Sequence, residues 1–177
     1  MKEDTIAQNL RRIRNEAGVS LSKAAEMTGV SKAMLGQIER QESSPTIATL
    51  WKISQGFHLP LSALLLERSC PLGGETVRFP GSIEVRIVFP FDANLGEETF
   101  EITLKPDQVH QSEAHEAGLI EDVIVVSGSM EVDVDGTRHA LEAGAGFRFA
   151  ADQPHVYRGC SQGAVFLNIH HYVRAGI

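Results

Sequence analysis

The chain has 177 residues, of which 42% are hydrophobic and 22% charged, and its formal net charge is −7 at pH 7. This length suffices for one good core or two small ones, and the composition is that of a globular protein. Every apolar run is shorter than the roughly 18 residues of a transmembrane helix, and the N-terminus lacks the apolar region of a secretory signal. Cys70 and Cys160 follow no metal-binding spacing. We therefore expect a cytoplasmic protein with free thiols and no membrane partner.

The charge is divided unevenly between two parts of the chain. Residues 1–66 hold eight Lys and Arg against six Asp and Glu, whereas residues 67–177 hold eight against seventeen. A mildly basic head on an acidic body suits DNA binding by the head, because phosphate neutralisation supplies much of the affinity. A surplus of two positive charges favours that function only weakly.

Residues 1–66 repeat at the spacing of helices and predict five short ones. Apolar residues recur every three or four positions before Gly18, which is a typical helix terminator. Ser20 and Ser31 are predicted N-caps of the second and third helices, and Gly29 separates these two helices. Ser44, followed by Pro in the first helical position, is the predicted N-cap of the fourth helix. The run "PLSALLLE" predicts a short fifth helix.

The rest of the chain predicts a linker and then an all-β domain. Residues 67–78 carry Pro and Gly-Gly without periodicity and indicate the linker. From residue 79 onward, short alternating runs such as "ETFEITL", "EDVIVVS", "SMEVDVD", "HVYRG" and "AVFLNIHHYV" are separated by Gly, Asp or Pro. Many short strands at this spacing indicate a sandwich or barrel over residues 79–177. The expected architecture is thus α+β, with an all-α head and an all-β body.

The second and third predicted helices form a candidate helix-turn-helix. In "LSKAAEMTGVSKAMLGQIER", small residues allow two helices to cross closely, Gly29 makes the turn, and Ser31 opens a helix that could enter the major groove. Amide side chains read purine edges, Met and Ala can contact thymine methyl groups, and basic or hydroxyl groups bind phosphates. The candidate DNA-binding residues are Lys23, Ser31, Lys32, Ala33, Met34, Gln37, Arg40, Ser43 and Thr46.

The run "GVSKAMLGQIERQESSPTIATLWKIS" resembles the XRE-type, phage-repressor-like helix-turn-helix family. The resemblance covers all five helices without a gap and implies a DNA-binding domain over residues 1–66. It also implies that Glu39 and Arg40 are a structural pair at the end of the recognition helix. The family often has Gln early in its second helix for a phosphate contact, and this chain has Lys23 near that position. The alternative is a helical interaction module that does not bind DNA.

The predicted strands contain the runs "EAHEAGLIEDVIVVSG" and "GAGFRFAADQPHVYRG", with which residues 79–177 resemble the cupin family, whose jelly-roll barrel often holds a metal. In the first run, Glu113 and His115 occupy the positions of the first motif's His-x-His, and Glu121 occupies that of its Glu. In "GAGFRFAADQPHVYRG", His155 holds the histidine position of the second motif. Glu113 departs from the pattern, the interval between His115 and Glu121 is longer than usual, and three residues of the second motif differ: Ala150, Asp152 and Gly159.

These residue types favour a divalent metal, which we predict to be Zn, Fe, Mn or Ni. His115, Glu121 and His155 are the expected ligands with Glu113 as a fourth, because alternate residues of a strand share one face. His110 is an alternative to Glu113. The other interpretation of these residues is a polar barrel mouth that binds no metal. A calcium-loop pattern in "EVDVDGTRHALE" is interpreted as a hairpin, because Asp-Gly interrupts alternating strands and no helix flanks it.

Other side chains are candidates for a ligand pocket, in which an inward arginine could bind a carboxylate. They are Arg86, Tyr157, Asn168 and His170. The combined resemblance implies a regulator whose head binds an operator and whose barrel senses a small effector. We expect a homodimer, because one head covers only one of two operator half-sites. Possible metal and arginine contacts favour a small polar effector such as an amino acid or carboxylate. The alternatives are a metal-dependent enzyme attached to a DNA-binding head and a barrel that serves only for dimerisation. We expect no catalytic residues.

Overall fold

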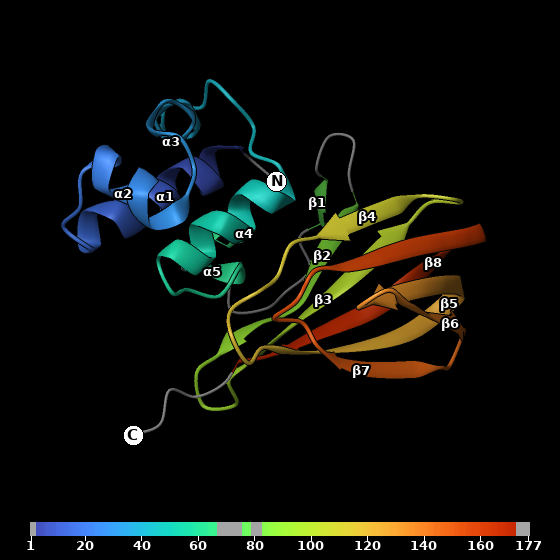
Figure 1. The fold of residues 1–177 in the computed structure, drawn as a ribbon. Coiled ribbons are helices and arrows are strands. Elements are labelled where there is room, and N and C mark those ends of the chain that lie inside the picture. Colours follow the sequence, from blue (N-terminus) through green and yellow to red (C-terminus); the bar gives the residue numbers. More distant parts are fainter. Residues whose placement is uncertain (1–2, 67–75, 79–82, 173–177) are drawn as a thin grey trace. The chain divides into compact units, whose positions relative to one another are not determined.

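The computed structural model describes residues 3–66, 76–78 and 83–172, and the chain divides into two compact units, Met1–Pro71 and Leu72–Ile177. The first unit is helical and the second is built of strands (Figure 1). Most of the predicted linker lies outside the described residues. Its end differs from the prediction, because Thr76–Arg78 forms strand β1, which pairs with β2.

The first unit contains the five predicted helices. They are α1 (Glu3–Glu16), α2 (Leu21–Thr28), α3 (Lys32–Glu39), α4 (Ile47–Gly56) and α5 (Ser62–Leu65). Ser20 and Ser31 are N-caps as predicted, each accepting a hydrogen bond from a backbone amide three residues on. The prediction for the fourth helix is wrong by two residues. Its N-cap is Thr46, whose hydroxyl accepts from the amide of Thr49, and the helix begins after the proline.

Buried contacts hold α1 and α4 against the other helices. Leu10, Leu35 and Leu50 from three different helices are each at most 1% exposed. The amide of Asn9 donates to two backbone oxygens at the end of α5, at 3.1 and 2.8 Å. A Cβ at Gly56 would lie 2.6 Å from the Cα of Thr28, so α4 packs directly on the backbone of α2.

The described residues of the second unit form a sheet of eight strands. The strands are β1, β2 (Glu84–Asp92), β3 (Glu97–Leu104), β4 (Val109–Ser112), β5 (Ile120–Val134), β6 (Thr137–Glu142), β7 (Gly146–Ala150) and β8 (His155–His171). The main order is β1-β2-β3-β8-β5-β6, with β4 also paired to β8 and β7 also paired to β5. All pairs are antiparallel, as expected for a jelly-roll.

Strands β5 and β8 are longer than predicted, because each joins two runs that the sequence separates. The first half of β5 pairs with β7 and its second half with β6, while β8 pairs first with β4 and then with β3. The two strands bend where Gly128 meets Gly163, both at positive φ. A Cβ at Gly128 would lie 2.1 Å from the carbonyl oxygen of Gly163. The bend places two layers of the sheet on either side of one interior (Figure 1).

The hairpin predicted from Asp-Gly is confirmed. Asp135 and Gly136 both have positive φ, and β5 pairs with β6 directly beside them. Met130, Val132 and Val134 point inward and are buried, while the acidic residues between them point outward. Inward residues of both layers thus form the apolar part of the barrel interior.

Candidate metal centre and DNA-binding surface

The three best metal-ligand candidates come from different parts of the barrel. Glu121 is in the first half of β5, His155 begins β8, and His115 lies in the connection before β5. The backbone amide of His115 donates to the carbonyl oxygen of Ala151 at 2.9 Å, which fixes this connection against the end of β7. Strand pairing and this bond therefore bring residues 40 positions apart in sequence to one place.

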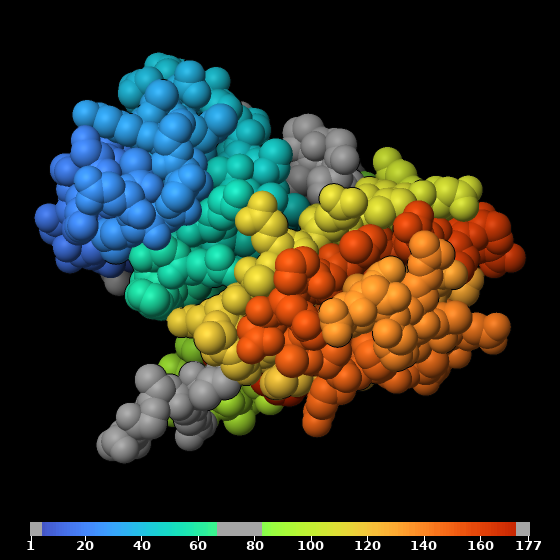
Figure 2. Space-filling view, in the orientation of Figure 1, coloured from blue at the N-terminus to red at the C-terminus, as the bar shows by residue number. Residues whose placement is uncertain are grey.

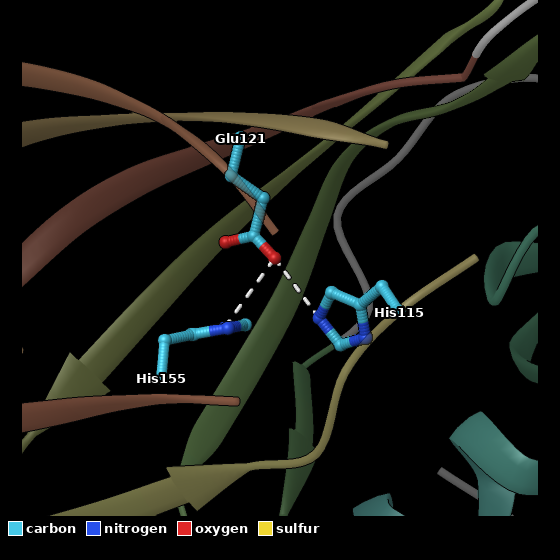
Figure 3. A group of neighbouring side chains, drawn as sticks. All are labelled: His115, Glu121 and His155. Carbon is cyan, nitrogen blue, oxygen red and sulfur yellow. Dashed lines mark ion pairs between the residues drawn. The ribbon is translucent and has the colours of Figure 1, made fainter. Parts of the chain in front are cut away.

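The ligand atoms of His115, Glu121 and His155 all lie within 4.8 Å of one another. Figure 3 shows the Glu121 carboxylate pointing between the two imidazoles, with Oε1 2.9 Å from His115 Nε2 and 3.6 Å from His155 Nε2. Glu121 and His155 are each 1% exposed and His115 is 8% exposed. The cluster is therefore shielded from bulk water. In such an interior an ion pair is strong and an unpaired charge is costly.

Two further side chains fix the other oxygen of Glu121. The hydroxyl of Tyr157 donates to Oε2, and Nδ2 of Asn168 donates to the same atom at 2.6 Å. Nδ2 of Asn168 also lies 3.0 Å from the Tyr157 oxygen. With Oε2 saturated, Oε1 is directed toward the histidines. The sequence placed Tyr157 and Asn168 in a ligand pocket, and both lie in this interior.

The two ring nitrogens of His155 have different neighbours. Nδ1 lies 3.0 Å from the carbonyl oxygen of Gln153, so the proton belongs on Nδ1 and the Nε2 lone pair faces Glu121. Nε2 of His155 is buried, makes no hydrogen bond within the described part of the chain and faces Oε1 of Glu121 at 3.6 Å. Two acceptor atoms that face each other are the arrangement that a shared cation satisfies. The residues therefore fit a divalent metal.

Burial and mutual charge set the protonation of the cluster. Burial acts to raise the pKa of Glu121, but the charge of His170, the hydrogen bond and charge of His115, and the charge of His155 together hold it well below its usual range. Burial lowers the pKa of His155, and Glu121 offsets this only partly. Burial and the negative charge of Glu121 raise the pKa of Tyr157. An ionised carboxylate and a neutral imidazole are the forms that bind metals.

Two predicted site residues are not in the cluster. Glu113 is exposed and is not part of the three-residue group. Arg86 lies on the outer face of β2, where its guanidinium donates to both carboxylate oxygens of Glu101 at 2.8 and 2.6 Å. Arg86 faces outward because its neighbours Val85 and Ile87 are the inward residues of the strand.

His110 and His170 border the cluster. The ring of His110 is parallel to that of Tyr157, at a centroid distance of 6.4 Å. Burial, with smaller contributions from neighbouring charges, lowers the pKa of His110 to about 4. His170 is 4% exposed and its Nε2 lies 3.6 Å from Oε1 of Glu121.

In the first unit, α2, Gly29 and α3 form the predicted helix-turn-helix. Gly29 has a φ of 67° and its amide donates to the carbonyl oxygen of Ala25 at 3.0 Å, which ends α2. Val30 and Ala24 are buried at the crossing. The segment from α2 to α3 forms part of the surface of this unit (Figure 2).

Most predicted DNA-binding residues are exposed. Leu35, Gly36 and Ile38 form the buried face of α3. The exposed residues are Lys23, Ser31, Lys32, Ala33, Gln37, Arg40 and Thr46. Met34 and Ser43 are partly buried, with Ser43 Oγ 3.8 Å from the Met34 sulfur.

The pairing implied for Glu39 and Arg40 is wrong. Glu39 accepts two hydrogen bonds from Arg14 of α1, at 2.6 and 3.0 Å, and Arg40 donates to Glu42 at 2.8 and 2.7 Å. The Glu39 side chain is 8% exposed and that of Arg14 is 15% exposed. This ion pair ties α3 to α1, whereas Arg40 remains at the surface. The Arg14–Glu39 pairing has no local signature, because the two residues are 25 positions apart.

The fold and the site define a helix-turn-helix head combined with a cupin barrel. Residues 10–64 match the helix-turn-helix family HTH_3, and residues 100–170 match the cupin domain family Cupin_2. The described residues include no helix long and apolar enough to cross a membrane.

Known proteins share both parts. The chain is 42% identical to the HTH-type transcriptional regulator SutR of Escherichia coli, over 96% of each chain. A solved HTH_3 family transcriptional regulator from Vibrio cholerae is 44% identical, with a TM-score of 0.88 and 97% of each chain covered. A solved cupin domain of an XRE family regulator from Enterobacter cloacae is 41% identical, with a TM-score of 0.51, and covers 52% of this chain and 98% of its own. The chain therefore belongs to the XRE-type transcriptional regulators that carry a C-terminal cupin domain.

Proposed function

We propose that this regulator is a cytoplasmic homodimer that binds an operator through α3 and senses a small polar metabolite through a divalent metal in its barrel. The observation that carries the proposal is the buried His115, Glu121 and His155 cluster in a chain with a DNA-binding head. A cytoplasmic location follows from the need to reach DNA.

The head is proposed to read bases with the exposed first turns of α3. Lys32, Ala33 and Gln37 are exposed there, with Met34 partly so, and suit base edges and methyl groups. Polar and basic side chains around α3 are proposed to bind DNA phosphates. Such contacts position the head on the DNA without reading its sequence. These groups are Lys23, Ser31, Arg40, Ser43 and Thr46.

The barrel is proposed to hold Zn, Fe(II), Mn or Ni through His115, Glu121 and His155. Two imidazoles and one carboxylate suit these ions and leave positions open for another ligand. When bound, the ion supplies a positive centre to which an amino acid or carboxylate can bind. Tyr157 and Asn168 hold the carboxylate of Glu121 in place for this role.

The charge of the interior favours the metal, and not arginine, as the partner of an anionic effector. Among the described residues of the barrel, two carboxyl groups, Glu98 and Glu121, are buried beside three histidines, and no Lys or Arg is buried. Arg86 is paired with Glu101 on the outer face. A carboxylate would therefore enter a negatively charged interior unless a cation preceded it. We propose that metal and effector bind in that order.

A sensor is preferred to an enzyme because the regulators compared above share both domains over nearly their full lengths. To act as a sensor, the effector must bind one arrangement of the dimer better than another. The test is operator affinity of the chelated and metal-loaded protein, with and without candidate amino acids and carboxylates. A change that His115→Ala/His155→Ala abolishes supports sensing. Equal affinities, with turnover of a candidate, favour the enzyme.

The dimer is proposed because operator half-sites lie roughly 34 Å apart and one head covers one of them. Ile124 and Val126 of β5 are 40% and 54% exposed, and Leu167 lies opposite Ile124 on the same outer face. We assign a second copy of the chain to this face. Ile124→Glu should give a monomer by sedimentation, whereas Leu95→Glu, at an exposed apolar residue in the β2–β3 turn, should leave a dimer.

A further inference from the structure

His170 lies at the candidate centre although the sequence motifs assign the fourth ligand position to Glu113. Its Nε2 is 3.6 Å from Oε1 of Glu121, the same distance that separates this oxygen from His155 Nε2. Its ring centroid is 5.8 Å from that of His115. His155 and His170 belong to the two halves of β8, so the bend in this strand brings both histidines to Glu121 from different layers.

A second buried carboxylate lies behind His170. Glu98 of β3 is 0% exposed and pairs in register with His170 across the two strands. Its Oε1 lies 3.8 Å from Nδ1 of His170 and accepts a hydrogen bond from the hydroxyl of Tyr172. At 3.8 Å the contact is longer than a hydrogen bond, but a negative carboxylate beside Nδ1 favours a proton on that nitrogen and so leaves the other nitrogen able to bind a metal. Here that other nitrogen is Nε2, which faces Glu121.

Glu113 lacks this setting. Glu113 is exposed, whereas His170 is buried with its Nε2 3.6 Å from Oε1 of Glu121, although neither residue belongs to the group whose ligand atoms all lie within 4.8 Å of one another. We infer that His170, oriented by Glu98, is the fourth metal ligand and takes the place that the family's missing histidine would fill. This inference rests on the proposed metal site. It gives a divalent ion three imidazoles and one carboxylate, a set suited to Zn and Fe(II).

Cobalt(II) titration of the full-length protein tests the inference, because its visible spectrum reports the ligands of the ion. His170→Gln should weaken cobalt binding at least tenfold and change the visible bands. Glu113→Gln, the matched control, should leave affinity within twofold and the spectrum unchanged. Glu98→Gln should weaken binding about tenfold, because it leaves the ligands in place but removes the carboxylate that orients His170.

A new absorption band in a cysteine variant separates loss of a metal ligand from simple unfolding of the protein. His170→Cys should produce a near-ultraviolet thiolate-to-cobalt absorption, and Glu113→Cys should not, because only a residue that touches the ion can give this band. Wild-type affinity in His170→Gln together with no such band in a folded His170→Cys overturns the inference but leaves the metal site standing. No cobalt binding by the wild type overturns both.

Discussion

Nε2 of His115 and Oε1 of Glu121 lie 2.9 Å apart in the barrel interior, although a loop supplies one residue and a strand the other. The contact depends on the loop being fixed by the bond from His115 to Ala151 and on Tyr157 and Asn168 saturating the far oxygen of Glu121. The ligand set is thus held by its surroundings before any ion binds, which limits the ordering cost of binding.

The bend between the two barrel layers depends on a close backbone approach. Gly128→Ala should lower the free energy of unfolding by about 3 kcal/mol or more, since a Cβ there meets the Gly163 oxygen at 2.1 Å. Gly144→Ala is the control. Gly144 also has positive φ but has open space around its Cβ position, so only the conformational cost of about 1–2 kcal/mol applies. Equal losses in chemical denaturation would contradict the role of the close approach.

The half-buried ion pair between α1 and α3 should matter more than an exposed one. Glu39→Gln leaves the half-buried Arg14 without a charged partner and should cost about 2 kcal/mol of unfolding free energy. Glu16→Gln removes an exposed i,i+4 pair with Arg12 and should cost less than about 0.5 kcal/mol. Urea denaturation measures both. Similar small losses would mean that Arg14 finds water or another partner.

Operator binding should separate base-reading from phosphate-binding residues. Gln37→Ala should reduce discrimination between operator and altered operators by about 1–3 kcal/mol, with Lys32→Ala in the same class. Lys23→Ala should weaken all sequences equally and lower the salt slope by about one. Lys105→Ala, in the exposed β3–β4 turn, is the control. Unchanged affinity and preference in both α3 variants would refute the assignment of α3.

His110 should make the metal-free protein less stable in mild acid. Its pKa is about 4 in the folded state and about 6.5 when unfolded, so between these values the unfolded chain binds a proton that the folded chain does not. Stability should therefore fall as pH drops below about 6.5 and level off near 4. His110→Gln should reduce this slope in chelator-treated protein, measured as unfolding free energy against pH. Parallel curves for both proteins would show that His110 does not contribute.

Local signals in the sequence predicted the elements of the head well. Caps such as Ser20 and Ser31 act on the amides next to them, so their role is visible in a few residues. The start of α4 was misplaced because Ser44 and Thr46 are both good caps on either side of a proline.

The sequence predicted that the second unit is a β-barrel, but it did not predict the bounds of the long strands or which strands pair. Glycine marks both the end of a strand and a bend within one, so Gly128 and Gly163 were read as breaks in β5 and β8. The pairings of Glu98 with His170 and of Arg86 with Glu101 depend on strand register across the sheet. Motif spacing predicted His115, Glu121 and His155 as metal ligands. It could not decide between Glu113 and His170 as the fourth ligand, because that choice depends on which side chain is buried beside Glu121.

Elemental analysis of protein purified without chelator or nickel resin tests the metal centre most directly. We predict about one divalent metal per chain and its loss in His115→Ala/His155→Ala, with added Zn, Mn, Ni or Fe(II) raising the melting temperature of the wild type only. No metal in the wild type, together with a melting temperature that none of these ions changes, would contradict the account.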